Sequence, residues 1–247
     1  MGRCIYLRKG EVHTVPVVGI QASDLPIGQI VKLMEGGVET EFIVVHQGIP
    51  GSMYDSSCDG TWLLRKDVYS QTMAWDFQYE GSGTIVYDYC SLKRWLNNDY
   101  MALLGSTEQA TVKEVKVPYV KYVGSSSSVV SGAEGAIAKA FPLSASEVGW
   151  TGAIDSTILA DGSRLAYFLD GNSTEAKNRR IGYLSGSATS YWTRSPKGPP
   201  ASIWEVRSTG ENTSIASDYT SGHVRPALII PSTSIFDGKT YTLLGGK

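Results

Sequence analysis

Histidine is the side chain that most often moves protons or binds zinc near neutral pH, and the sequence contains His13, His46 and His223. None lies in an HExxH pattern or beside a spaced carboxylate cluster, and no GxSxG turn supplies a serine nucleophile. His46 ends an apolar run and is expected to be structural, whereas His223 precedes Val224 in a turn and is expected to be exposed. The histidines therefore predict no catalytic or zinc site, and the chain is not expected to be an enzyme.

Carboxylates offer a second kind of chemistry, because Asp55, Asp59, Asp67 and Asp76 lie in one part of the chain. A glycoside hydrolase needs two carboxyl groups about 5 to 9 Å apart across the sugar, a separation that the sequence does not fix. Asp55 and Asp59 also suggest a calcium site, but the alternating oxygen ligands of an EF-hand loop are absent. Surface turns are the simpler interpretation, so no metal or cofactor is predicted.

Cysteine chemistry is equally unsupported. Cys4, Cys58 and Cys90 are odd in number and widely spaced, which argues against a disulfide framework and against a CxxC site. They are expected to be buried or half-buried thiols. A Cys58–Cys90 bridge is the less favoured alternative.

The stretch from Gly186 to Val224 differs in character, because Tyr and Trp lie there among Ser, Thr, Asn and Gly. Aromatic rings give large rigid contacts and small polar residues give adaptable hydrogen bonds, a mixture typical of antibody-like surfaces. We predict a ligand-binding face here. Core packing is favoured for Tyr191 and Trp192, while for Trp204 core and contact are equally supported. The candidate contact residues are Lys197, Trp204, Arg207, Glu211, Asn212, Asp218 and Tyr219.

Several local patterns predict the elements that position this face. Ile30–Glu35 and Val38–Gly48 flank Gly36-Gly37 and predict a hairpin whose second arm is a central strand, and Thr61–Tyr69 predicts another strand. Further short strands are expected at Tyr191–Arg194, Ile203–Ser208, Thr213–Ser217 and Val224–Ile230.

Helical spacing is clearest in Ser91–Leu104, with Ser91 as N-cap and Gly105 as stop. The apolar residues that fall broadly on one face of this helix are Leu92, Trp95, Leu96, Leu103 and Leu104. A second helix is expected from Ser106 or Thr107 through Val112. Ser144 and Glu147 fit a capping box, and Gly124–Gly135 is expected to be a flexible loop. These segregated strands and helices predict an α+β domain.

Composition limits the partners. The 247 residues suffice for one large domain or two small ones, and the net charge of -2 comes with no basic stripe for nucleic acid. No apolar run is long enough to span a bilayer, and Met1–Gly10 carries charges where a signal peptide would be apolar. Synthesis in the cytoplasm without export by that route is expected. Residues 1–26 are expected to be an attachment or oligomerisation arm, or an edge strand, preceding a domain over 27–247.

Two motifs carry a family resemblance: Tyr191-Trp192-Thr193-Arg194-Ser195-Pro196, and Gly222-His223-Val224-Arg225-Pro226-Ala227-Leu228 continuing to Ser232. They resemble the WWLRSP and GVRPALILPS motifs of an uncharacterised domain family of phages and prophages of gut bacteria. Upstream segments including Glu41–Gln47 and Arg180–Leu184 resemble it too. Tyr191, Thr193 and His223 depart from the usual pattern.

That family is similar to the C-type-lectin-fold variable tail proteins diversified by retroelements. The resemblance implies a C-type-lectin-like α+β domain with short antiparallel sheets, two main helices and a loop-rich C-terminal face over 186–224. It implies that Trp192, Arg194, Pro196, Arg225 and Pro226 are scaffold. It also implies that Ser190, Ser202 and Ser214 are contact residues, in addition to those named above. Among the contact residues, Tyr219 is predicted from composition alone and not from the resemblance.

The resulting hypothesis is a phage tail or fibre-tip adhesin in the virion, which binds a bacterial surface protein or glycan non-covalently and contacts other tail or baseplate proteins. A homo-oligomer is expected, with a trimer favoured because multivalency strengthens weak binding. The alternatives are a structural virion protein without a ligand and an enzyme that degrades envelope glycans.

Overall fold

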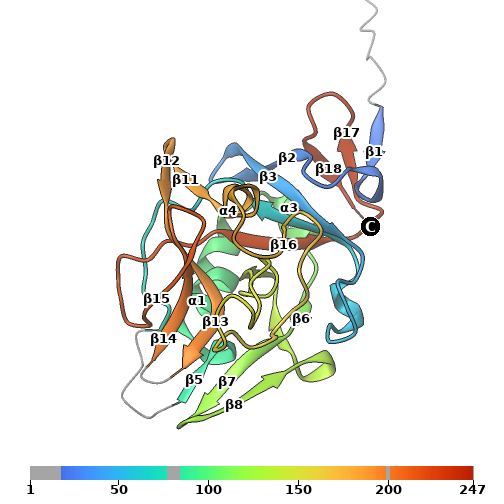
Figure 1. The fold of residues 1–247 in the computed structure, drawn as a ribbon. Coiled ribbons are helices and arrows are strands. Elements are labelled where there is room, and N and C mark those ends of the chain that lie inside the picture. Colours follow the sequence, from blue (N-terminus) through green and yellow to red (C-terminus); the bar gives the residue numbers. More distant parts are fainter. Residues whose placement is uncertain (1–17, 77–83, 199–200, 247) are drawn as a thin grey trace, which may run out of the picture.

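The computed structural model describes residues 18–76, 84–198 and 201–246, and β-strands dominate this part of the chain (Figure 1). Strands hold 38% of the residues and helices 17%, with one main helix of 13 residues among several small antiparallel sheets. The expected C-type-lectin-like α+β fold with two main helices is therefore wrong. The second expected helix, α3 (Ser106–Thr111), forms but has only 6 residues.

A five-stranded antiparallel sheet with the order β10-β16-β4-β3-β2 forms the centre of the core. Its strands are β2 (Ile30–Glu35), β3 (Val38–Gln47), β4 (Thr61–Arg65), β10 (Ala140–Pro142) and β16 (Pro226–Ile230). Gly36 and Gly37 join β2 to β3 at φ +60° and +81°, and a type I′ turn requires positive φ at both of its central positions. The predicted hairpin is confirmed, and β3 lies inside the sheet as expected.

The main helix runs through α1 (Ser91–Trp95), a π-helical segment η4 (Leu96–Tyr100) and α2 (Met101–Leu103). Its N-cap is Cys90, whose sulfur accepts a hydrogen bond from the backbone N of Lys93, and not Ser91 as predicted. Leu92, Leu96 and Tyr100 are fully buried. Tyr100 takes the place that the sequence pattern had assigned to Leu103, which is 36% exposed.

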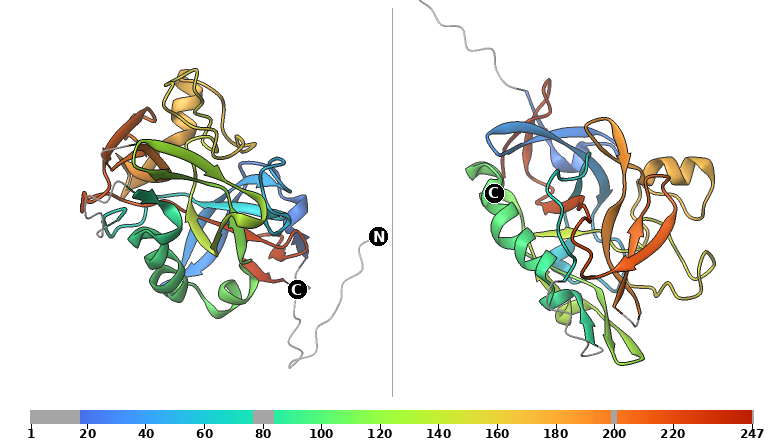
Figure 2. Two further views of the ribbon diagram at one scale, coloured as in Figure 1. Left: turned by 90° about the horizontal axis from the view of Figure 1, so that it is seen from below. Right: turned by 90° about the vertical axis from the view of Figure 1, so that its left-hand side faces the viewer.

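Five smaller sheets surround this core (Figure 2). Their strands are β1 (Gly19–Gln21) with β17 (Ile235–Asp237) and β18 (Leu243–Gly245); β5 (Thr84–Val86) with β7 (Tyr119–Val123) and β8 (Ser126–Val130); β6 (Val115–Val117) with β9 (Ala136–Ala138); β11 (Gly182–Leu184) with β12 (Ser187–Thr189); and β13 (Tyr191–Gly198) with β14 (Ser202–Val206) and β15 (Asn212–Ala216). The remaining helices are α4 (Thr174–Arg180) and the 3-10 turns η1 (Ala22–Asp24), η2 (Ser56–Cys58), η3 (Tyr87–Tyr89) and η5 (Gly132–Glu134).

Three further expectations have mixed outcomes. The expected flexible loop at Gly124–Gly135 instead contains the hairpin partner β8, which pairs with β7 along its whole length, and the 3-10 turn η5. The predicted capping box forms, since Glu147 Oε2 accepts from the backbone N of Ser144 and Ser144 Oγ accepts from the backbone N of Glu147, but a turn follows it and not a helix. Within residues 1–26, the described part forms the edge strand β1, and residues 1–17 lie outside the described residues.

Side chains fill the interior densely, and Trp62, Trp75, Trp150, Trp192 and Trp204 are all fully buried. Figure 2 shows strands of the central sheet between the main helix and the β13–β15 sheet. The start of the helix is linked to the loop after β15, because Asp76 accepts from Ser91 Oγ and donates its backbone N to the carbonyl of Ser217. No helix in the described ranges has the length and apolar character needed to cross a membrane.

Candidate functional site

The predicted binding stretch folds mainly as the β13–β15 sheet and its two connecting loops. β14 is the central strand and pairs with β15 in continuous register, so that Trp204 faces Ser214 and Val206 faces Asn212. The four strands predicted between Tyr191 and Ile230 are confirmed as β13 to β16. This antiparallel sheet therefore holds half of the candidate contact residues, and the loops beside it hold the other half.

Exposure separates the candidate contact residues into groups. Arg207, Asp218 and Tyr219 are exposed, and the Tyr219 side chain is 44% accessible. The half-buried candidates are Ser190, Lys197, Ser202, Glu211, Asn212 and Ser214. Trp204 alone is buried.

Trp204 was predicted as a candidate contact residue, and this prediction is wrong because the residue is buried. Its side chain is 1% exposed, and the ammonium of Lys197 lies over the ring, 4.8 Å from the centroid. β14 has neighbours on both edges and both of its faces are covered, which buries Ile203 and Val206 as well. Trp204 is therefore part of the packing beneath the face, and Lys197 is engaged with it.

The first loop of the face, residues 207–211, rests on helix α4. Glu211 forms an ion pair with Lys177 at 2.8 Å, and this hydrogen bond lowers the pKa of Glu211. Gly210 has φ +77°, and a Cβ there would overlap the carbonyl oxygen of Lys177. The carbonyl of Gly210 also accepts from Nε of Arg180 at 2.8 Å. Arg207 is therefore presented from an anchored loop.

The second loop, residues 217–223, is anchored on Trp192. A Cβ at Gly222 would overlap the indole nitrogen of Trp192, which donates to the carbonyl of Met73 at 3.0 Å. The carbonyl of Gly222 in turn accepts from the backbone N of Met73 at 2.8 Å. This close packing holds the loop that exposes Asp218 and Tyr219.

The residues expected to be scaffold are buried, as predicted: Trp192, Arg194, Pro196, Arg225 and Pro226. Tyr191 and Trp192, expected in the core, are 3% and 1% exposed. Arg225 donates from Nε to the carbonyl of Arg65 at 2.8 Å and lies over the Tyr191 ring. The two recognisable motifs thus frame the face from inside the protein.

A buried polar network lies under the motif that contains Arg194. The Arg194 guanidinium forms a two-pronged ion pair with Glu147, through Nη1 at 2.6 Å and Nη2 at 2.5 Å, and both side chains are 0% exposed. Burial opposes the charge on Arg194, but Glu147 outweighs it and raises the Arg194 pKa. Tyr54 donates its hydroxyl to Glu147 at 2.8 Å. The network holds β13 in place at Arg194.

Asp161 extends this network. Its Oδ2 accepts from Ser195 Oγ at 2.5 Å, while its Oδ1 has no hydrogen-bond partner among the described residues. Burial raises the Asp161 pKa, with the Arg194 charge acting in the opposite direction. Sequence reasoning missed Asp161 entirely and identified Glu147 only as a helix cap, because nothing local marks a partner that lies 47 residues away.

Among the described residues, those first considered for catalysis do not form one cluster, and they make local structural hydrogen bonds. His46 Nδ1 accepts from the backbone N of Ala166 at 3.2 Å, and burial lowers the His46 pKa. His223 is half-buried, not exposed as expected, and its Nδ1 lies 3.0 Å from the carbonyl of Tyr69. Asp55 caps η2 by accepting from the backbone N of Ser57, and Asp76 accepts from Ser91 Oγ. His13 falls outside the described residues.

Metal and disulfide chemistry can also be checked against the geometry. Within the described ranges, no group of three or more His, Cys, Asp or Glu side chains is placed to hold a metal ion. Cys58 and Cys90 are free and buried, so the alternative of a bridge between them is wrong, and Cys4 lies outside the described residues.

The comparisons with known proteins identify one relationship. A family model described as a domain of unknown function, DUF6273, matches residues 59–232. No curated protein and no solved structure matches the chain. The match contains the β13–β15 sheet, both loops and the Glu147–Arg194 pair, and it ends before β17.

Proposed function

The chain belongs to the DUF6273 family, whose function is unknown, and we propose that it is a non-enzymatic receptor-binding module. Its binding face consists of Arg207, Asn212, Ser214, Asp218 and Tyr219, which we call the C-terminal face. The single observation that carries the proposal is that these polar and aromatic side chains reach the surface from two loops and an edge strand anchored on buried groups.

Rigid presentation matters for affinity, because a binding surface that is already ordered avoids the entropy cost of ordering it on contact. The C-terminal face also has the composition of a paratope: an exposed tyrosine, both signs of charge, and small hydrogen-bonding residues. In this proposal Trp204 and Lys197 do not contact the ligand. They form the packed layer beneath the C-terminal face.

The biological setting of the proposal comes from the motif resemblance in the sequence. We place the protein at a phage tail or fibre tip, where it binds a surface protein or glycan of a gut bacterium and contacts other tail proteins. A trimer would increase avidity by raising the effective concentration of the second and third sites. The chemistry of the C-terminal face suits either a protein or a glycan ligand, because side-chain hydrogen bonds and aromatic contacts serve both.

A cell-binding experiment tests the proposal. The labelled protein is incubated with a panel of gut bacteria, and bound label is measured by flow cytometry. We expect binding to a subset of strains and a roughly 30-fold loss of affinity in Tyr219→Ala, as for a central aromatic contact worth about 2 kcal/mol. Tyr183→Ala is the matched control, since Tyr183 is 42% exposed but lies in β11, outside the C-terminal face.

Three results would count against the proposal. They are the absence of binding to every strain, equal losses in Tyr219→Ala and Tyr183→Ala, and sugar release from the bound envelope. The last result would favour the enzymatic alternative. Failure of particle assembly in Tyr219→Ala, in a protein that binds no strain in its unmodified form, would favour a structural virion role.

A further inference from the structure

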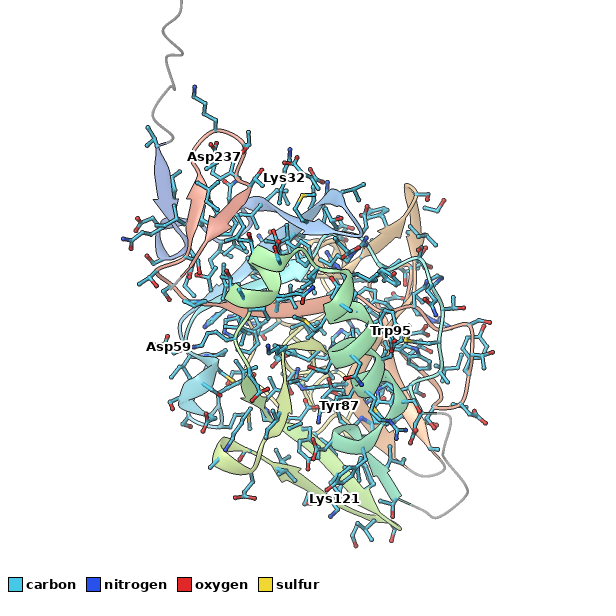
Figure 3. The ribbon with its side chains drawn as sticks, turned by 180° about the vertical axis from the view of Figure 1, so that it is seen from behind. Lys32, Asp59, Tyr87, Trp95, Lys121 and Asp237 are labelled. Carbon is cyan, nitrogen blue, oxygen red and sulfur yellow. The ribbon has the colours of Figure 1, made fainter. Side chains whose placement is uncertain are left out.

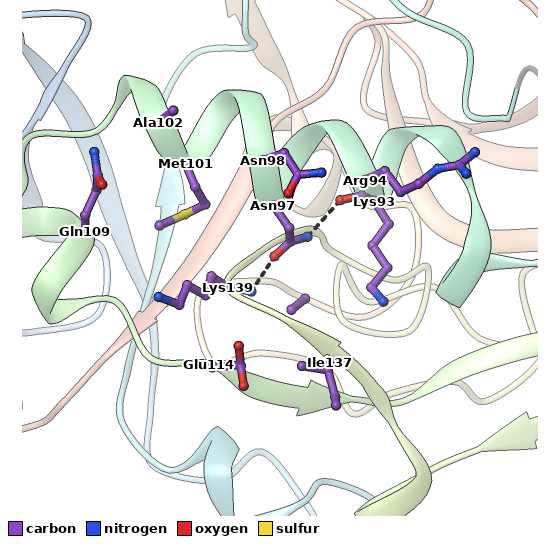
Figure 4. A pocket seen from close by; sticks show the side chains of 11 residues that line it. Lys93, Arg94, Asn97, Asn98, Met101, Ala102, Gln109, Glu114, Ile137 and Lys139 are labelled. Atoms are coloured by element: carbon purple, nitrogen blue, oxygen red, sulfur yellow. Dashed lines mark hydrogen bonds between the residues drawn. The ribbon is translucent and has the colours of Figure 1, made fainter.

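A groove lies between the main helix and strand β9 (Figure 4), and none of the residues that line it belongs to the C-terminal face. Its cavity has a volume of about 540 Å³. It is lined by the helical residues Lys93, Asn98 and Met101, by Ile137 of β9, and by Lys139, which lies between β9 and β10. Figure 4 shows Lys93 pointing from the helix toward Ile137. The groove is large enough for a small ligand.

Asn97 fixes the two walls of the groove relative to each other. Its Oδ1 accepts from the backbone N of Lys139 at 2.6 Å, and its Nδ2 donates to the carbonyls of Lys93 and Ala140 at 2.8 and 3.0 Å (Figure 4). Asn97 lies in the π-helical segment η4, and such segments occur frequently at functional sites. Since this amide already bonds the backbone N of Lys139 and the carbonyl of Ala140, an added peptide strand could not pair with those two groups.

The groove continues into a second cavity of about 380 Å³, which shares Lys93 and Ile137 with the first. Tyr89 lines the second cavity and is 73% exposed, the largest exposure of any aromatic side chain in the described residues. Lys93 is held at the junction by an ion pair with Asp88 at 2.6 Å. The two cavities thus form an elongated channel with an aromatic ring at one end.

The cationic excess is concentrated in the first cavity, where Lys93, Arg94 and Lys139 lie with the single carboxylate Glu114. In the second cavity, Lys116 lies with the carboxylates Asp88 and Glu134. The Lys139 ammonium makes no hydrogen bond or ion pair with any described residue, unlike that of Lys93. This bias contrasts with the net charge of -2 of the whole chain. Ile137 is 51% exposed between the charged groups and adds an apolar surface.

We propose that this channel binds an acidic oligosaccharide. The exposed face of Tyr89 would stack on one sugar ring, Ile137 would contact another, and Lys139 would pair with a carboxylate of the sugar chain. The Asn98 amide is available for hydroxyl groups. An extended ligand with polar edges, apolar ring faces and negative charge fits these side chains, and the blocked strand edge disfavours an acidic peptide that adds as a strand. The site is separate from the C-terminal face and does not depend on its function.

An oligosaccharide array tests this inference, with uronic- and sialic-acid oligosaccharides beside neutral oligosaccharides of equal length. We expect the full chain to bind acidic members and not their neutral counterparts, with weaker binding as salt rises. Lys139→Glu and Tyr89→Ala should each weaken binding by roughly tenfold or more. Lys121→Glu is the matched control, because it makes the same charge change on β7, away from the groove (Figure 3).

The opposite results would overturn the inference: no binding to any acidic member, equal binding to neutral members, or equal losses in Lys139→Glu and Lys121→Glu. Displacement of the bound sugar by poly-glutamate at lower concentration than by free acidic oligosaccharide would show that the channel prefers a peptide. Tyr219→Ala should leave array binding unchanged, so failure of this inference is distinguishable from failure of the receptor-binding proposal.

Discussion

Replacing Glu147 with glutamine removes the only negative charge that pairs directly with the buried Arg194 guanidinium in the described structure. The new amide would keep the shape of the side chain but leave a buried cation without its counter-charge. Removing one partner of a buried ion pair typically costs about 3 to 5 kcal/mol. In a chain of this size, each kcal/mol changes Tm by about 2 to 4 °C. The expected fall in Tm is therefore roughly 6 to 20 °C.

Thermal unfolding followed by circular dichroism at neutral pH measures this fall. Glu211→Gln is the control, since the Glu211–Lys177 pair lies at the surface with side chains 44% and 29% exposed and, as a solvent-screened pair, should contribute little to stability. Tyr54→Phe removes the hydroxyl that donates to Glu147 and should cost about 1 to 3 kcal/mol, which gives a milder test if Glu147→Gln does not fold. Equal Tm values for Glu147→Gln and Glu211→Gln would refute the reasoning.

Three other variants test the remaining parts of the fold. Asp161 has a raised pKa, so its contribution to stability is full below its ordinary pKa of 3.8 and is lost as pH rises through the raised value. Asparagine does not ionise, so the Tm of Asp161→Asn minus the Tm of wild type should grow from pH 4 to pH 7. A difference that stays constant with pH would contradict this. Gly210→Ala should lower the free energy of unfolding by about 1 to 3 kcal/mol from strain at positive φ, and further because the added Cβ overlaps Lys177. Denaturant unfolding should therefore show a larger loss than in Gly171→Ala, where the added Cβ meets open space. Trp204→Ala should lower the free energy of unfolding by about 3 to 5 kcal/mol, because Trp204 is a core residue. A loss below about 1 kcal/mol would indicate that Trp204 lies at the surface, where it could contact a ligand.

Local signals were enough to predict much of the strand pattern. The hairpin of β2 and β3 was predictable because Gly36-Gly37 permits a tight turn and the flanking residues favour strands. The main helix was predictable from the spacing of its apolar residues, although the π-helical segment changed which of them face the core. In each case the determining residues lie close together in the sequence.

Features set by distant contacts were not predictable in this way. Trp204 looked equally suited to core or surface, and only the packing of β14 between two strands, with Lys197 over its ring, buries it. The Glu147–Arg194 pair joins a turn to a distant strand, and no local pattern indicates it. Both the local helix pattern and the family resemblance led to the expectation of two main helices in an α+β fold, and it is wrong because α3 is too short to match the main helix.

Hydrogen–deuterium exchange of the protein on envelope fragments from a strain that it binds shows which part of the chain contacts the ligand. We expect slowed exchange concentrated in peptides that cover residues 207–219, the span of the C-terminal face, with Tyr219→Ala reducing that protection. Protection confined to other parts of the chain, with residues 207–219 exchanging as in the free protein, would contradict this expectation.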